Sequence, residues 1–216
     1  MSALPPDYDA DPGRRAAWAA PLDVHDMVGP ELEGPTLDVG CGEGRLAARM
    51  RPDVDWYGVD SSEAQLRSCP YRPVVRADMR ALPFRSGSFA EVAHLWCLYH
   101  LADPVAAVEE ARRVLRVGGR YYASTAARDN DHEIMREGYP ASPFDAEEAA
   151  EIVGQIFDEI EARPWDGRFF PLQTREEIRA YCRHNFIPPE RADQAEVPLW
   201  LTKRGVLVCA TKRELR

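Results

Sequence analysis

Three glycines at alternate positions follow a short apolar run, in the segment Leu37-Asp38-Val39-Gly40-Cys41-Gly42-Glu43-Gly44-Arg45-Leu46. Glycines in this arrangement let the backbone approach a ligand closely and expose amide groups where a helix begins. The dinucleotide fingerprint needs a glycine at position 45, where this chain has Arg45, and a P-loop needs Gly-Lys-Ser/Thr, which is missing here. The segment therefore predicts a ligand-binding turn that departs from the standard nicotinamide and P-loop patterns.

The part of this segment from Asp38 to Gly44 resembles motif I of the class I S-adenosylmethionine-dependent methyltransferases, in the small-molecule branch that includes ubiquinone and menaquinone C-methyltransferases. Later motifs of that family are resembled, in order, by Tyr57-Gly58-Val59-Asp60-Ser61-Ser62, Ala77-Asp78-Met79-Arg80-Ala81-Leu82-Pro83-Phe84, Ser88 to His100 with Asp103-Pro104, and Glu110 to Gly119. The resemblance covers residues 34–126. It implies that S-adenosylmethionine is the cofactor and S-adenosylhomocysteine the product.

The resemblance also implies roles for three acids. Asp60 takes both ribose hydroxyls, which one carboxylate can accept through charge-assisted hydrogen bonds. Asp78 and the next residue hold the adenine, and Asp38 holds the glycine loop or reaches the methionine amino group through water. The alternatives are a helix-capping or surface acid at Asp60 and a turn-forming acid at Asp78. The expected cofactor-binding residues are Asp38, Gly40, Cys41, Gly42, Gly44, Asp60, Ser61, Asp78, Met79 and Leu95.

Methyl transfer asks little acid–base chemistry of the protein. The sulfonium methyl is already activated, so holding the nucleophile in line with the carbon–sulfur bond supplies most of the acceleration. A general base is needed only where the acceptor keeps its proton at neutral pH. His100 is the candidate base, although a structural histidine at the start of the following helix is the preferred interpretation. His132, in an acidic loop, either lines the acceptor pocket or is simply solvated, and both interpretations stay open.

Two departures from the family pattern bear on the subfamily that the chain resembles and not on its fold. The chain has Phe89-Ala90 where the family often has Phe-Asp, and Arg116-Val117-Gly118-Gly119 where it often has Lys-Pro-Gly-Gly. The motif of enzymes that methylate exocyclic base nitrogens is missing after the fourth strand. The formal charge of −9 also argues against a nucleic-acid partner, because phosphates favour a basic surface.

The elements that must position these residues alternate along the chain. Strands are expected at 36–39, 56–59, 74–75, 90–96, 120–125 and 205–211, with an extended stretch at 160–172. Helices are expected within 13–29, at 45–50, from 62, from 104 to about 116, from about 145, and from 174 to about 185. Two of them begin with the form of a capping box, Ser62-Glu63-Ala64-Gln65 and Thr174-Arg175-Glu176-Glu177. Alternation at this spacing predicts parallel βαβ units. The expected fold is an α/β, doubly wound, mostly parallel seven-stranded sheet with a C-terminal antiparallel strand pair.

Length and composition fit one globular domain. The 216 residues, 45% of them hydrophobic, predict a single domain with covering helices in 1–33, a cofactor-binding half in 34–126 and substrate elements in 127–216. No signal sequence or membrane span is expected, so the predicted location is the cytoplasm. The five scattered cysteines predict buried thiols, not disulfides or a zinc site, and no metal is expected. The predicted state is a monomer or homodimer.

Three functions are compatible with these motifs. The favoured one is methyl transfer to a small-molecule oxygen, nitrogen or carbon. The alternatives are a catalytically silent cofactor-binding module and a dinucleotide oxidoreductase, which Arg45 disfavours. We expect the acceptor pocket to be roofed by Tyr8–Trp18, the loop Ala127–Phe144 and the aromatic stretch Trp165–Phe170.

Overall fold

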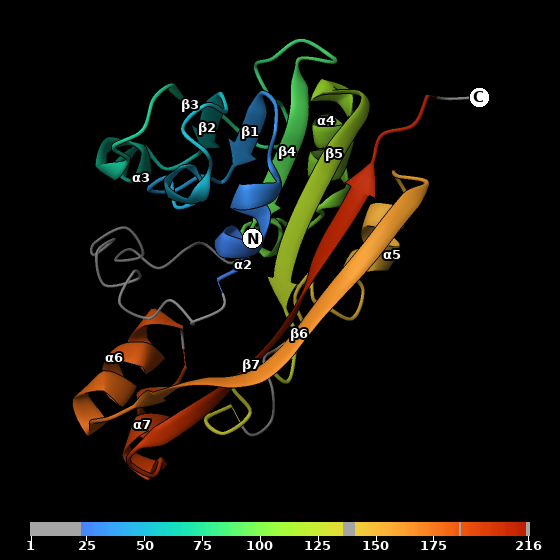
Figure 1. Ribbon diagram of the computed structural model, residues 1–216. Coiled ribbons are helices and arrows are strands. Elements are labelled where there is room, and N and C mark those ends of the chain that lie inside the picture. Colours follow the sequence, from blue (N-terminus) through green and yellow to red (C-terminus); the bar gives the residue numbers. More distant parts are fainter. Residues whose placement is uncertain (1–22, 136–140, 186, 215–216) are drawn as a thin grey trace.

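The computed structural model describes residues 23–135, 141–185 and 187–214 of the chain. Among these residues seven strands form one twisted sheet in the order β3-β2-β1-β4-β5-β7-β6 (Figure 1). The strands are β1 (Thr36–Val39), β2 (Trp56–Asp60), β3 (Val74–Arg76), β4 (Phe89–Leu95), β5 (Leu115–Ala126), β6 (Glu159–Leu172) and β7 (Leu199–Thr211). The first five strands are parallel, and β7 runs antiparallel to both β5 and β6. This confirms the predicted fold class.

The strand order reverses between β1 and β4, because β2 and β3 lie on one side of β1 and the later strands on the other. In open parallel sheets ligands bind beyond the carboxyl ends of the strands at such a switch point. The glycine segment starts at the end of β1. The topology therefore places it where a ligand is expected.

Helices cover both faces of the sheet. The helices of the described residues are α2 (Val24–Val28), α3 (Glu63–Ser68), α4 (Val105–Val114), α5 (Ala149–Gly154), α6 (Arg175–His184) and α7 (Pro189–Gln194), with 3₁₀ turns at Gly29–Glu31, Ala47–Arg49 and Leu98–His100. The neighbours Tyr121 and Tyr122 on β5 distinguish the two faces, because successive strand residues point to opposite sides. Tyr121 packs with residues of α4 and α5 in the main core, whereas Tyr122 packs with residues of α2. We call these the α4 face and the α2 face.

A small lobe extends from the far end of the β6–β7 ribbon, where α6 and α7 pack beside the strands (Figure 1). It has its own apolar cluster, Ile134, Leu172, Ile178, Tyr181, Cys182, Ile187, Ala192, Leu199 and Leu201. Its first helix starts with the predicted capping box, in which Thr174 and Glu177 exchange side-chain-to-backbone hydrogen bonds. The lobe is therefore a second, smaller core attached to the sheet by two long strands.

The prediction of a helix at 45–50 is wrong. The chain makes turns there and only one 3₁₀ turn, Ala47–Arg49. Gly42 and Gly44 both have positive φ, so a right-handed helix cannot begin before residue 45, and Pro52 disfavours helical backbone at residue 51. Only residues 45–50 lie between these two limits.

Smaller differences concern the ends of elements. The helix expected from 104 to 116 ends at Val114, because Leu115 already pairs with Phe89 in the sheet. The helix expected near Asp145 begins at Ala149. The last strand begins at Leu199, six residues earlier than predicted, because it pairs with β6 along its whole length. Of the helices expected within 13–29, residues 13–22 lie outside the described residues.

Candidate cofactor site

The glycine loop needs its glycines. Gly40, Gly42 and Gly44 have φ of 72°, 52° and 79°, in the left-handed region that side chains disfavour. A Cβ on Gly40 would lie 2.6 Å from Cβ of Cys97, so the first glycine is also required by close packing. The amides of Gly40 and Cys41 donate to the Val59 carbonyl at 2.7 and 3.0 Å, which fastens the loop to the end of β2.

Asp60 joins this loop from the end of β2. Its Oδ2 accepts from the Gly42 amide at 2.9 Å and its Oδ1 accepts from the Ser62 amide at 2.8 Å. Ser62 in turn caps α3 by accepting from the Gln65 amide, as the sequence predicted. The carboxylate therefore lies against the glycine loop, and it holds the backbone that follows β1 and the backbone that follows β2.

Asp38 lies behind the loop on β1. It is 3% exposed, and its Oδ2 accepts from the Trp56 indole nitrogen at 3.2 Å. Burial raises the pKa of Asp38 to about 7 against the effect of that hydrogen bond, and the nearby charge of Asp60 adds to the rise. Asp38, the glycine loop and Asp60 are thus brought together in one site.

Asp78 lies just after the end of β3. The residue before it, Ala77, donates its amide to the Asp60 carbonyl. The exposed carboxylate of Asp78 pairs with the Arg80 guanidinium, with Nη2 to Oδ2 at 2.6 Å, and these hydrogen bonds lower the pKa of Asp78. The structure therefore places Asp78 beside the site, with its side chain turned to Arg80.

The remaining predicted residues have different surroundings. Ser61 is exposed, and its carbonyl accepts from Arg76 at 3.1 Å. Met79 packs against the main core, and Leu95 is buried in the cluster on the α2 face. Cys41 is buried against Trp56, Leu66 and Cys69. Of these four, Cys41 lies within the glycine loop itself.

The two histidines that the sequence offered are both exposed. His100 ends the 3₁₀ turn after β4, is exposed, and packs edge-on against Tyr99 with ring centroids 4.4 Å apart. His132 is also exposed, with Nε2 3.6 Å from Oε1 of Glu133, which accepts hydrogen bonds from Thr202. The roles of both histidines therefore stay predictions.

Three residues that support the loop, Cys69, Tyr71 and Cys97, were not predicted from the sequence. A Cβ on Gly44 would lie 2.7 Å from Cδ2 of Tyr71 and 2.9 Å from Sγ of Cys69, and Sγ of Cys97 donates to the Val39 carbonyl at 3.3 Å. Burial raises the pKa of both thiols, which makes them packing groups, not nucleophiles. Their distance from the loop in sequence left no spacing signal to find them by.

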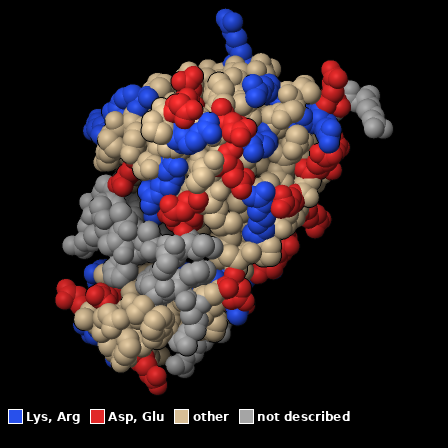
Figure 2. Space-filling model, viewed as in Figure 1, with Lys and Arg blue, Asp and Glu red and all other residues tan. Residues whose placement is uncertain are grey.

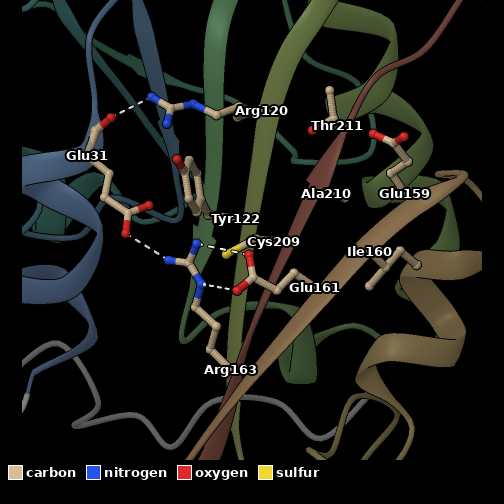
Figure 3. Close-up of a pocket in the computed structure, with 10 residues that line it drawn as sticks. All are labelled: Glu31, Arg120, Tyr122, Glu159, Ile160, Glu161, Arg163, Cys209, Ala210 and Thr211. Carbon is tan, nitrogen blue, oxygen red and sulfur yellow. Dashed lines mark hydrogen bonds and ion pairs between the residues drawn. The ribbon is translucent and has the colours of Figure 1, made fainter.

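A separate hollow of about 300 Å³ lies over β5, β7 and β6 (Figure 3). Its charged groups are already paired, partly with one another and partly with Glu91 and Arg213 outside the hollow. Arg163 contacts Glu31 at 2.7 Å and Glu161 at 3.0 Å, and Arg120 donates to the Glu31 carbonyl. None of the residues that line this hollow belongs to the glycine loop. We therefore do not assign the cofactor to it.

On the face shown in Figure 2, basic groups alternate with acidic ones and do not form a continuous basic band. No helix among the described residues is long and apolar enough to cross a membrane.

Comparison with known proteins agrees with the geometry. Residues 37–123 match the family model described as a methyltransferase domain. The 27-O-demethylrifamycin SV methyltransferase of Amycolatopsis mediterranei is 35% identical over 120 residues, which are 47% of this chain and 44% of that protein. The chain spans 28–44% of the length of the first curated relatives that it matches.

Two solved structures show the same fold. The YcgJ protein from Bacillus subtilis has a TM-score of 0.62 at 18% identity, covering 89% of this chain and 97% of its own. A Haemonchus contortus N-methyltransferase, solved with phosphomonomethylethanolamine and S-adenosylhomocysteine, has a TM-score of 0.60 at 17% identity, covering 91% of this chain and 54% of its own. The family match covers residues 37–123, less than half of the chain, and it includes the motifs at the switch point. This part of the chain is therefore similar to a methyltransferase domain.

Proposed function

We propose that this protein transfers the methyl group of S-adenosylmethionine to the oxygen, nitrogen or carbon of a small-molecule acceptor. The observation that carries the proposal is the left-handed glycine loop at the β1–β4 switch point, fastened to Asp60 at the end of β2. The residues fit the cofactor because the loop exposes backbone without side chains beside a carboxylate. The rifamycin methyltransferase, whose named acceptor is a small molecule, supports the same class.

In this proposal the chain's residues bind and orient. Asp60 accepts the two ribose hydroxyls, since each carboxylate oxygen has a lone pair beyond the one used by a backbone amide. Asp78 and Met79 hold the adenine, and Asp38 holds the loop from behind. Gly40, Cys41, Gly42, Gly44, Ser61 and Leu95 complete the cofactor site. The cofactor supplies an activated methyl group, so the proposal requires no base, and it does not depend on the exposed His100.

The proposal extends to partners and organisation as the sequence predicted them. We infer a small-molecule partner and neither nucleic acid nor membrane, a cytoplasmic monomer or homodimer, and one domain over residues 1–216. The segments Tyr8–Trp18 and 136–140 of the predicted acceptor roof lie outside the described residues, as do the side chains of Phe169 and Phe170.

The test is methyl transfer itself. Purified protein is incubated with methyl-labelled S-adenosylmethionine and fractionated metabolite pools, and label is followed into small molecules. Protein carrying Asp60→Ala serves as the matched control. Label that enters a small molecule only with the unmodified protein supports the proposal. Binding of S-adenosylhomocysteine without transfer to any pool would favour the silent binding module instead.

A further inference from the structure

The residue that follows β4 has an unusual backbone. Trp96 has φ of 62°, a left-handed conformation that is rare for a bulky residue and that tends to occur at functional sites. Its amide donates to the Ser124 carbonyl on β5 at 3.3 Å. The next residue, Cys97, is the one that packs against Gly40. Trp96 is thus one residue away from a direct contact with the glycine loop.

The left-handed turn changes the face on which this indole lies. Along β4, His94 contacts Tyr121 on the α4 face, and Leu95 packs on the α2 face. A regular strand would return residue 96 to the α4 face. Instead Trp96 packs with the cluster on the α2 face and meets Trp165 of β6, with ring centroids 5.7 Å apart and planes at 66°.

Trp165 also depends on a special backbone position. It pairs with Gly205 on β7, and a Cβ at that glycine would lie 2.3 Å from Cζ2 of the indole and 2.4 Å from the Thr125 carbonyl oxygen. Only glycine leaves room for the indole to lie across β7. A glycine inside a strand costs stability. It commonly occurs where another group must approach the backbone closely.

The two indoles are partly exposed, whereas Leu95, Tyr122 and Leu207 of the same cluster are buried. Apolar filling alone does not require a tryptophan in a left-handed conformation or a glycine within the strand. What an indole offers beyond apolar area is its π face, which favours a second flat ring.

We propose that Trp96 and Trp165 form the wall on which the methyl acceptor stacks, and that the acceptor is a planar, π-conjugated ring. This rests on the proposed function for the identity of the reaction, while the wall itself rests on the two indoles. Trp96 directly precedes Cys97, which packs against Gly40. The wall therefore places the stacked ring at the end of the sheet where the glycine loop lies.

The test measures binding of 1-naphthol and of its saturated analogue 1-decalol, by tryptophan fluorescence and calorimetry, to free protein and to protein saturated with S-adenosylhomocysteine. The unmodified protein should bind the flat ring more tightly than the saturated one. Trp165→Leu should weaken 1-naphthol binding about 2- to 12-fold, the range for an aromatic pair, and leave 1-decalol within about 2-fold. Trp165→Phe should recover part of the loss, and Trp200→Leu, at an exposed indole on the same strand pair, should change neither.

The outcomes separate the two proposals. Equal 1-naphthol affinity in the unmodified protein and folded Trp165→Leu protein overturns the wall, and so does equal binding of the flat and saturated rings. Failure of S-adenosylhomocysteine to bind overturns the proposed function, and the titration on free protein still decides the wall. Circular dichroism of each variant identifies any loss of fold, for which Trp165→Phe provides the second measurement.

Discussion

At the scale of single residues, two tasks fall on Asp60, one of them proposed and the other observed. The resemblance implies the ribose contact, and the structure adds hydrogen bonds from the Gly42 and Ser62 amides. We expect Asp60→Ala to weaken S-adenosylhomocysteine binding by about 1.5–3 kcal/mol, the range for hydrogen bonds to a charged group. The measurement is calorimetric titration.

The controls separate the two tasks. Asp60→Asn keeps one acceptor oxygen toward the loop and should lose less affinity than Asp60→Ala. Asp53→Ala, which removes an exposed acid that pairs with Arg51, should leave the affinity unchanged. An unaltered dissociation constant in a folded Asp60→Ala protein would mean that the ribose is held elsewhere.

Asp38 should make stability depend on pH. Its pKa in the folded protein is about 7, above the ordinary value of 3.8, so the folded state binds the proton more tightly than the unfolded state. Stability therefore falls as pH rises from about 4 to about 7 and then levels off. Between pH 5 and pH 8 this contribution is roughly 2–3 kcal/mol.

Urea unfolding at pH 5 and pH 8 tests this, with Asp38→Asn as the comparison. The amide keeps an acceptor for the Trp56 indole and has no proton to lose. The fall in stability between the two pH values should be smaller in Asp38→Asn by that amount. Equal falls in both proteins would show that Asp38 titrates normally.

At the scale of elements, the lobe is joined to the sheet by a buried polar group. Lys203 on β7 and Asp131 after β5 form an ion pair at 2.6 Å with side chains 18% and 1% exposed, and Tyr181 of α6 bonds to both. Lys203→Met leaves the Asp131 charge buried without its cation, which costs about 3–5 kcal/mol. Compared with the unmodified protein, the Lys203→Met protein should show a larger increase in hydrogen-exchange rate in α6 and the start of β7 than in β4.

Two companion variants decide whether the ion pair is the cause. Tyr181→Phe removes one hydroxyl and should cost less than Lys203→Met. The double change Lys203→Met with Asp131→Asn removes the uncompensated charge and should recover part of the loss. Uniform destabilisation of lobe and sheet would indicate that the lobe does not open separately.

The same scale shows what the sequence could predict. Alternating strands and helices, capping residues and the glycine series were local signals, so the parallel half and both N-caps at Ser62 and Thr174 were predicted correctly. The helix at 45–50 failed because backbone angles at Gly42 and Gly44 override helical spacing. The lobe, the length of β7 and the support of the loop by Cys97 depend on long-range pairing, which spacing along the chain does not encode.

At the scale of the whole molecule, cofactor binding should stabilise the fold. The glycine loop and Asp60 tie β1 to β2, and Cys97 ties the loop to β4, so a ligand there bridges strands that unfold together. S-adenosylhomocysteine at 100 times its dissociation constant should add about 2.7 kcal/mol. For a chain of this length, that stabilisation raises the melting temperature by roughly 5–10 °C. NADH should have no effect, because Arg45 interrupts the dinucleotide pattern. Scanning fluorimetry with each ligand measures this, and no shift at millimolar S-adenosylhomocysteine would overturn the cofactor assignment.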